Sequence, residues 1–340
     1  MYLVLQHRRE CKNRMDKQSY KAKSKKRYRS KKQKFLLLFL VLAGILALGI
    51  WSQNKKAGES GQNLNSSETI KPLENAGLEI HYIDVGQGDA TLLLCGEEAM
   101  LIDGGGNEME GRIRRYLKNL GIKELAYVVG THPDADHIGG LDEVISVFDC
   151  NRVILPEIKR DNVTYRDVTD AIRYRRAEEL TAKVGEVYPF GEASFTIVAP
   201  EGSYEEFNNH SVGLLFTYGE TRFLFVGDAE GPAEEQMLGS GIDLHADVLK
   251  IGHHGSSDST SQAFLDAVKP THAVISCGRA NEHGHPHTRV LNLLKKRDIS
   301  VYRTDLQGTV VLQSDGRVIR FLTEPTLDFT SGWDLQAGEN

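Results

Sequence analysis

From about residue 77 onward, short apolar runs alternate with polar turns that contain glycine. The first three runs have the length and spacing of antiparallel strands joined by tight turns. They lie at Leu78–Val85, Ala90–Cys95 and Ala99–Ile102. Ile113, Leu117 and Leu120 then recur at the spacing of one helix face. The pattern therefore predicts an antiparallel meander followed by a helix.

Strand and helix patterns continue to alternate along the rest of the chain. Further strands are predicted at Leu125–Val129, Arg152–Leu155, Phe195–Val198, Val212–Thr217, Arg222–Val226, Val248–Ile251, Ala273–Ser276, Ser300–Tyr302 and Thr309–Leu312. Further helices are predicted at Leu141–Phe148, Ala233–Leu238, Gln262–Val268 and Arg289–Lys296. Residues 157–183 are highly charged and predict a surface helix or flap. Because both halves begin with a meander, we expect an α/β protein with two mixed sheets face to face and helices outside.

The N-terminal segment differs sharply from the rest of the chain in charge. Residues 1–34 hold 14 Lys or Arg and two acidic residues, which is a local charge of +12. Because the whole chain carries −6, residues 35–340 carry −18. Residues 35–51 contain no charge, and as a helix they would span about 25 Å, the lower limit for a bilayer. Since Lys and Arg stay on the cytoplasmic side, this order predicts a basic cytoplasmic tail and a transmembrane anchor.

The remaining boundaries follow from composition. Residues 52–76 are polar and rich in Gly and Ser, which predicts a flexible linker. We expect a globular domain at 77–325, outside the cell, and a C-terminal tail at 326–340. The small residues Ala47 and Gly49 leave open a cleaved signal segment and a secreted protein, although the long basic tail favours an uncleaved anchor. Four scattered cysteines without CxxC spacing indicate neither a zinc ribbon nor a disulfide framework.

The segment directly after the strand predicted at Leu125–Val129 is dense in possible metal ligands. Within six positions it carries His132, Asp134, Asp136 and His137. Imidazole nitrogens and carboxylate oxygens are the ligands of hydrolytic Zn²⁺ and Mn²⁺ sites. A solvated polar turn is the alternative, since Asp, Pro and His are common in turns. The number of ligands in so short a segment favours the metal site.

Other polar residues also stand next to predicted strands, where a sheet presents side chains at its rim. Those that follow strands are Asp103, Asp228, His253, His254, His283, His285 and His287, and those that precede a strand are Asn208, His210 and Ser211. Taken singly, an Asp at a strand end is more often a turn former than a ligand. Their number and their shared location predict one site at the strand ends.

At these positions the sequence resembles the metallo-β-lactamase-fold hydrolases. More narrowly, it is similar to the lactamase-like domain of ComEC, the DNA-uptake channel protein, although we expect the multi-pass channel region of ComEC to be absent. The motifs that carry the resemblance are His81–Ala90, Ile102–Gly105, His132–Gly140, Asn208–Val212, Val226–Asp228, Leu249–Ser256 and Gly284–His287. The resemblance implies an αββα sandwich with two divalent metal ions, Zn²⁺ or Mn²⁺, at the open edge between the sheets.

The resemblance also implies roles for the clustered ligands. His132 and Asp134 would bind the first metal. Asp136 and His137 would bind the second, and Asp228 would bridge both. In the broad family a His usually stands at the position of Asp134. The ComEC-like branch has an Asp there, as this chain does. The additional anionic oxygen favours Mn²⁺ or Mg²⁺ more than a three-histidine zinc site would.

Outside that motif, the resemblance implies both ligands and helpers. The late His ligand is predicted to be His285, with His287 as the second choice. Asp103 would orient ligands from behind. His253 and His254 would lie beside the substrate as catalytic residues, to hold an anionic oxygen or to protonate the leaving group.

The third motif of the broad family supplies a further His ligand. Here the ComEC-like pattern Asn-x-x-Ser is matched by Asn208 and Ser211, and His210 lies inside it without an assigned role. Hydrolysis would use a metal-activated water, because a bound divalent metal lowers the pKa of water toward neutrality. Asp136 would orient this nucleophile as well as bind metal.

Three functions remain open on the sequence. The first is a phosphodiesterase or nuclease that acts on extracellular DNA, possible partners being single-stranded DNA and other phosphodiesters. The second is a hydrolase of a small or surface-attached substrate, such as a phosphorylcholine ester, a cyclic dinucleotide or a lactam. The ComEC resemblance and the Asp-rich motif favour the first function. The charge of −18 argues against a nucleic-acid substrate, because nucleic-acid binders normally carry a basic face, and is no obstacle to a small ligand. The third is a non-catalytic, metal-stabilised binding module.

Overall fold

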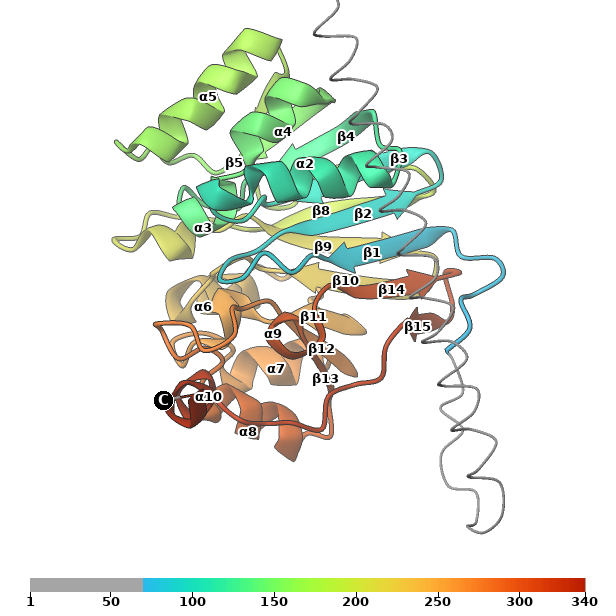
Figure 1. Cartoon of the computed structure of the whole chain (residues 1–340), viewed down its shortest axis with the longest axis vertical. Helices are drawn as coiled ribbons and strands as arrows, with labels where there is room; N and C mark the ends of the chain where they lie inside the picture. Colours follow the sequence, from blue (N-terminus) through green and yellow to red (C-terminus); the bar gives the residue numbers. More distant parts are fainter. Residues whose placement is uncertain (1–69, 340) are drawn as a thin grey trace, which may run out of the picture. The chain divides into compact units, whose positions relative to one another are not determined.

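Two mixed β-sheets lie face to face in the computed structural model, which describes residues 70–339 (Figure 1). The first sheet has the strand order β15-β14-β1-β2-β3-β4-β5-β6. Its strands are β1 (Leu78–Tyr82), β2 (Thr91–Cys95), β3 (Glu98–Ile102), β4 (Glu124–Val129), β5 (Asp149–Leu155), β6 (Glu178–Thr181), β14 (Val310–Ser314) and β15 (Ile319–Phe321). The meander β1-β2-β3 is antiparallel, as the sequence predicts.

The second sheet has the strand order β13-β12-β11-β10-β9-β8-β7. Its strands are β7 (Val187–Phe190), β8 (Ala193–Ala199), β9 (Gly213–Tyr218), β10 (Thr221–Phe225), β11 (Val248–Lys250), β12 (His272–Ile275) and β13 (Ser300–Arg303). Strands β10 to β13 are parallel to one another, whereas β7 to β10 are antiparallel. This sheet is therefore mixed in the same way as the first.

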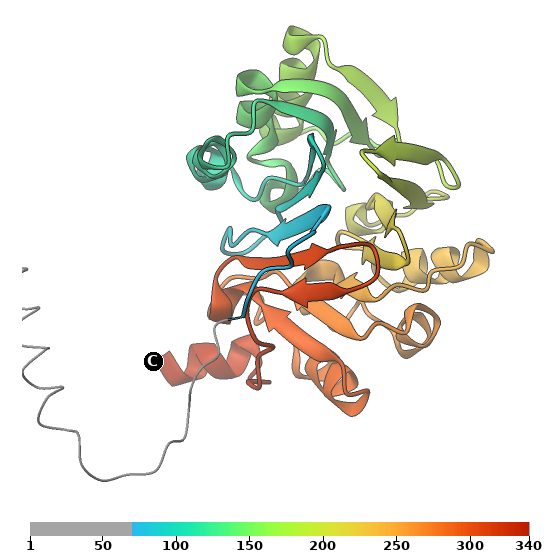
Figure 2. The same cartoon turned by 90° about the vertical axis from the view of Figure 1, so that its right-hand side faces the viewer.

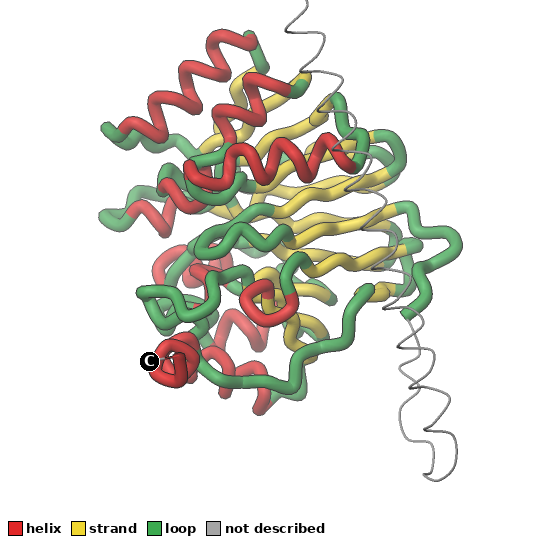
Figure 3. The backbone as a smooth tube through the Cα atoms, viewed as in Figure 1, coloured by secondary structure: helices red, strands yellow, loops and turns green. Residues whose placement is uncertain are grey.

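Helices cover the outer faces of both sheets (Figures 2 and 3). Over the first sheet lie η1 (Asn107–Met109), α2 (Glu110–Asn119), α3 (Ala135–Ile138), α4 (Leu141–Val147) and α5 (Val163–Arg175). Over the second lie α6 (Gly231–Gly239), α7 (Gln262–Val268) and α8 (Thr288–Lys296). Shorter elements are η2 (Phe207–His210), η3 (Gly252–Gly255), α9 (Thr304–Gln307) and α10 (Gly332–Glu339). Across residues 70–339, no helix is both long and apolar enough to cross a bilayer, and the anchor predicted at 35–51 lies outside the described residues.

The apolar residues form three separate clusters that match this layering. One fills the space between the sheets, one lies between the second sheet and its helices, and one lies between the first sheet and its helices. Strand periodicity explains the division, because successive side chains point to opposite faces. On β2, Leu93 joins the cluster between the sheets while Leu92 packs on the helix side. The arrangement is an αββα sandwich.

Two segments differ from their sequence-based interpretation. The charged region 157–183, predicted as a surface helix or flap, forms the helix α5 and also adds strand β6 to the edge of the first sheet. The segment 326–340, predicted as a C-terminal tail, contains α10. Its first residues contact the domain, since the Gly332 N–H donates to the Pro286 carbonyl at 3.2 Å.

The parallel strands determine where side chains can converge. β3 and β4 are parallel in the first sheet, and β10, β11 and β12 are parallel in the second. The loops that follow these strands carry the polar motifs found in the sequence. Because the carboxyl ends of parallel strands meet at one edge, residues that follow different strands are brought together there.

Candidate metal centre

Four buried side chains from four separate segments meet at this edge. They are Asp89, His137, Asp228 and His254, and the ligand atoms that they offer all lie within 4.8 Å of one another. Asp89 precedes β2, His137 lies in α3, Asp228 follows β10 and His254 lies in η3. Imidazole and carboxylate groups gathered in this way have the donor chemistry that divalent metals require.

His137 lies at the centre of the group. Its Nε2 is 3.2 Å from Asp228 Oδ1 and 3.3 Å from His254 Nε2. Burial alone would lower the pKa of His137, but the carboxylates of Asp228 and Asp103 outweigh it and hold the pKa well above its ordinary value. Two imidazole nitrogens and a carboxylate that face one another at this distance compete for protons. A divalent cation between them would satisfy all three, so these residues fit a metal.

Asp103 supports His137 from behind. Its Oδ2 accepts from His137 Nδ1 at 2.8 Å, and its two oxygens accept from the backbone N–H and the hydroxyl of Thr131 at 2.8 and 2.7 Å. Asp103 has a left-handed backbone with φ of 58°, which is uncommon for a residue with a side chain. This contact is the one that an orienting acid requires, because it leaves Nε2 of the imidazole directed at the cluster.

His132 is the second buried histidine of the motif. Its ring centroid lies 4.2 Å from that of His137, and its Nε2 has no hydrogen-bond partner. Burial and the neighbouring His137 lower the pKa of His132 to about 3, so the imidazole is neutral. Ser211 Oγ lies 3.3 Å from Nδ1 and also accepts the Asp228 N–H at 2.9 Å. A neutral imidazole with an unsatisfied buried nitrogen fits a further metal. Ser211 contacts both this imidazole and the Asp228 backbone, and so links the two residues.

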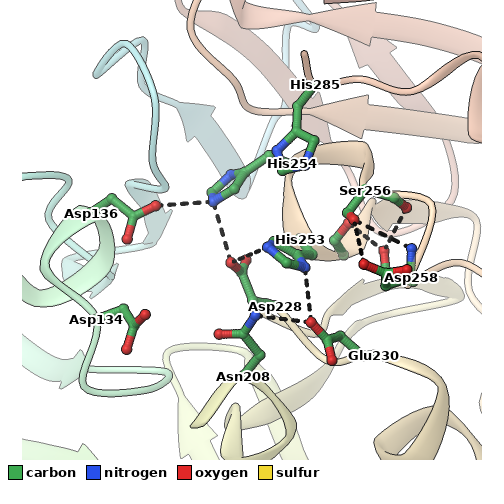
Figure 4. A network of polar contacts seen from close by, with 12 residues as sticks. Asp134, Asp136, Asn208, Asp228, Glu230, His253, His254, Ser256, Asp258 and His285 are labelled. Atoms are coloured by element: carbon green, nitrogen blue, oxygen red, sulfur yellow. Dashed lines mark hydrogen bonds and ion pairs between the residues drawn. The ribbon is translucent and has the colours of Figure 1, made fainter. Parts of the chain in front are cut away.

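Asp136 presents the accessible carboxylate of the site. Its Oδ2 lies 3.3 Å from His254 Nε2 (Figure 4). The same oxygen lies 4.0 Å from His137 Nε2, and the Asp136 side chain is 38% exposed. Burial raises its pKa, but His137 and His254 outweigh this and hold the pKa below its ordinary value. The carboxylate is therefore charged and open to the solvent side of the cluster.

Asp134 faces a different neighbour. Its carboxylate forms an ion pair with Arg160, and both side chains are about one-third exposed. The Arg160 guanidinium also lies over the Phe207 ring, 4.7 Å from its centroid. As a metal ligand Asp134 remains a prediction, because Arg160 occupies its carboxylate.

His253 lies beside the group rather than inside it. Its Nδ1 is 3.2 Å from Glu230 Oε1 and its Nε2 is 3.8 Å from Asp228 Oδ2 (Figure 4). Glu230 in turn accepts from Asn208 Nδ2 at 3.0 Å. His253 and His254 both have left-handed backbones, with φ of 47° and 52°. Such strained conformations are typical of functional loops, and here they direct the two neighbouring rings differently.

Two late histidines have different surroundings from those of His254. His285 is buried, and its ring centroid lies 6.0 Å from that of His254, outside the group of four. Burial and the histidines around it, His254 first, lower the pKa of His285 to about 3. His287 is held by loop backbone, since its Nδ1 accepts the Ser257 N–H at 2.9 Å. The geometry thus brings His254, predicted as a catalytic residue, into the position where a ligand would stand.

The other uncertain residues have structural contacts. His210 Nε2 lies 3.1 Å from the Tyr204 carbonyl, and its ring packs edge-on against Tyr204. Asp89, Lys250 and Glu230 also contact the cluster or its neighbours, although no role is predicted for them from the sequence. Asp89 lies in the glycine-containing segment between the first two predicted strands. The signal that could have found it was its acidic side chain next to a strand within a motif already singled out.

Residues 83–279 match the family model described as "Metallo-beta-lactamase superfamily", and this range contains all four residues of the buried group. The chain belongs to the metallo-beta-lactamase superfamily. Members of this superfamily are metal-dependent hydrolases, and the buried Asp and His cluster fits divalent metal binding. The expectation of a metallo-β-lactamase fold is thereby confirmed.

Several curated proteins are similar to this metallo-beta-lactamase chain. "ComE operon protein 3" of Bacillus subtilis (strain 168) is 31% identical over 278 residues, which cover 76% of this chain and 36% of that protein. "Recombination protein 2" of Haemophilus influenzae is 31% identical, covering 71% and 29%. "Competence protein ComA" of Neisseria gonorrhoeae is 30% identical, covering 67% and 31%. The chain thus spans about a third of the length of these relatives.

Proposed function

We propose that the domain is a metal-dependent phosphodiesterase that acts outside the cell, with single-stranded DNA as the favoured substrate. The observation that carries the proposal is the buried group of Asp89, His137, Asp228 and His254, beside the unpartnered His132 Nε2. Relatives named for competence and recombination support a DNA substrate. The extracellular location rests on the anchor proposed at 35–51.

The proposed metal assignment follows the geometry of the donors. His132 and Asp134 would hold one metal. Asp136, His137 and His254 would hold the other, with His254 as the late ligand in place of His285, because His254 Nε2 lies 3.3 Å from Asp228 Oδ2. Asp228 would contribute to both. Bound divalent metals lower the pKa of water and offset the charge that develops during phosphodiester hydrolysis.

Two side chains next to the cluster have the geometry for the proton steps. The exposed carboxylate of Asp136 accepts a hydrogen bond from the attacking water and orients it. Glu230 faces His253 Nδ1 and fixes the ring so that Nε2 points toward Asp228. From that side, an N–H on His253 Nε2 can donate to the oxygen of the leaving group.

A second candidate, hydrolysis of a small ester, is favoured by the charge of the chain. Residues 35–340 carry −18, and an acidic surface repels a polyanion more strongly than a small substrate. The same cluster would serve a phosphorylcholine ester or a cyclic dinucleotide. Comparing single-stranded DNA with such esters at low and high salt separates the two candidates.

The first test combines metal analysis with a variant of the full-length protein in detergent. We expect wild type to bind two divalent metals and to cleave a phosphodiester in a metal-dependent manner. Asp136→Asn should lower turnover at least about 100-fold, the range of a lost general acid–base group, without changing the circular dichroism spectrum. Asp170→Asn, on the exposed face of α5, is the control and should keep wild-type turnover. Metal binding without cleavage of any ester would instead favour the binding module.

A further inference from the structure

A buried ion pair joins the two sheets directly behind the cluster. Lys250, the last residue of β11, places its Nζ 2.8 Å from Asp89 Oδ2. The two residues are only 2% and 4% exposed. Lys250 Nζ also donates to the Ile251 carbonyl at 2.9 Å. Removing two charges from water is costly unless both are paired and hydrogen-bonded, so this pair needs an explanation.

The second oxygen of Asp89 faces the cluster. His254 Nδ1 hydrogen-bonds to the Ser276 carbonyl at 3.0 Å. Asp89 Oδ1 lies 3.2 Å from the same nitrogen as an ion-pair contact and has no hydrogen-bond partner. A carbonyl acceptor and a carboxylate charge on one side of the ring favour the tautomer that carries its proton on Nδ1. The other nitrogen, Nε2, is the one that faces Asp136, His137 and Asp228.

The backbone of the same turn contacts the metal-ligand motif. The Asp89 N–H donates to the Asp136 carbonyl at 3.1 Å, and the Gly105 N–H donates to the Asp89 carbonyl at 2.8 Å. A Cβ on Gly88, whose φ is +132°, would lie 2.3 Å from the Asp136 carbonyl oxygen. Only glycine permits this approach. The turn therefore fixes Asp89 relative to Asp136 before any metal is considered.

We propose that Asp89, with its charge balanced by Lys250, is a positioning residue that sets the orientation and tautomer of His254 for metal binding. The proposal rests on the proposed metal site. A carboxylate charge next to the nitrogen that faces away from the metal holds the ring in place and makes it a better ligand. Lys250 holds the Asp89 carboxylate charged and in place, and so connects the second sheet to the site.

The test measures metal affinity as well as activity, in full-length protein in detergent. Zn²⁺ affinity is measured by competition with a chelator, and the ligand field by the visible spectrum of the Co²⁺-loaded protein. Asp89→Asn should retain the wild-type number of metals, lower the affinity of one of them roughly 10- to 100-fold and change the Co²⁺ spectrum. The matched control is Asp305→Asn, which breaks the ion pair of Arg303 and Asp305, whose side chains are 0% exposed. It should lower the Tm without changing metal affinity.

A double variant separates positioning from folding. Asp89→Leu combined with Lys250→Met removes both buried charges and should keep or regain thermal stability while metal affinity stays low. Recovery of affinity together with stability would overturn the proposal, because the pair would then act through folding. Loss of a whole metal equivalent in Asp89→Asn would make Asp89 a ligand and would also overturn it. A wild-type protein that binds no divalent metal would refute the proposed function itself.

Discussion

At the scale of single residues, the sharpest question is which late histidine binds metal. His254 Nε2 lies 3.3 Å from both Asp136 Oδ2 and Asp228 Oδ2, whereas His285 has its ring 6.0 Å away from that of His254. We predict that His254→Ala loses one metal equivalent and that His285→Ala keeps both. Metal content by mass spectrometry checks this directly. The opposite pattern would restore His285 as the ligand and return His254 to the substrate side.

Arg160 provides a second residue-scale prediction. Its guanidinium contacts Asp134 and lies over the Phe207 ring at the border of the site. A metal bound to Asp134 would compete for that carboxylate and leave the guanidinium to bind substrate phosphate, which arginine recognises well. Arg160→Ala should raise KM for a phosphodiester about tenfold, corresponding to one lost charged hydrogen bond, with a smaller effect on kcat. Arg166→Ala, an exposed arginine on α5, is the control, and an unchanged KM in Arg160→Ala would contradict the role.

At the scale of elements, the spacing of apolar residues predicts the helices and strands that bury several apolar side chains on one face. α7 has the bounds predicted from its apolar spacing, because Phe264, Leu265 and Val268 are all buried. β7 was not predicted, because Phe190 is its one buried residue, while Val187 is 62% exposed. An edge strand of this kind is specified by pairing with β8, which local sequence does not encode.

The site also contains residues that local sequence pattern predicts and residues that only tertiary contacts define. The sequence could place Asp103, Asp136, His137 and Asp228 at strand ends, because each follows a recognisable apolar run. It could not separate His254 from His285, since the direction of each ring depends on local backbone geometry. The role of Asp89 could not be predicted either, because it depends on a contact with Lys250, which lies far away in the sequence and in the other sheet. Tertiary contacts, rather than local pattern, decide these cases.

The C-terminal helix gives an element-scale prediction. A Cβ on Gly284 would lie 2.2 Å from the Trp333 ring, so this ring packs directly against the loop that carries His285. Trp333→Ala should lower the free energy of unfolding by roughly 1–2 kcal/mol, since the side chain is half-exposed. Leu327→Ala, at a side chain that is 92% exposed, is the matched control and should leave the Tm unchanged. Equal melting curves for wild type and Trp333→Ala would show that α10 does not stabilise this loop.

At the scale of the whole molecule, charge distribution predicts the orientation in the membrane. Residues 1–34 carry +12, residues 35–51 carry no charge, and the rest of the chain carries −18. Since Lys and Arg next to a span resist translocation, we predict that the basic tail stays inside and that the hydrolase domain lies outside. Protease added to intact protoplasts should digest the domain and leave a short protected fragment that contains the basic tail. A domain that resists protease until the protoplasts are lysed would reverse the orientation, and an extracellular DNA substrate would then be excluded.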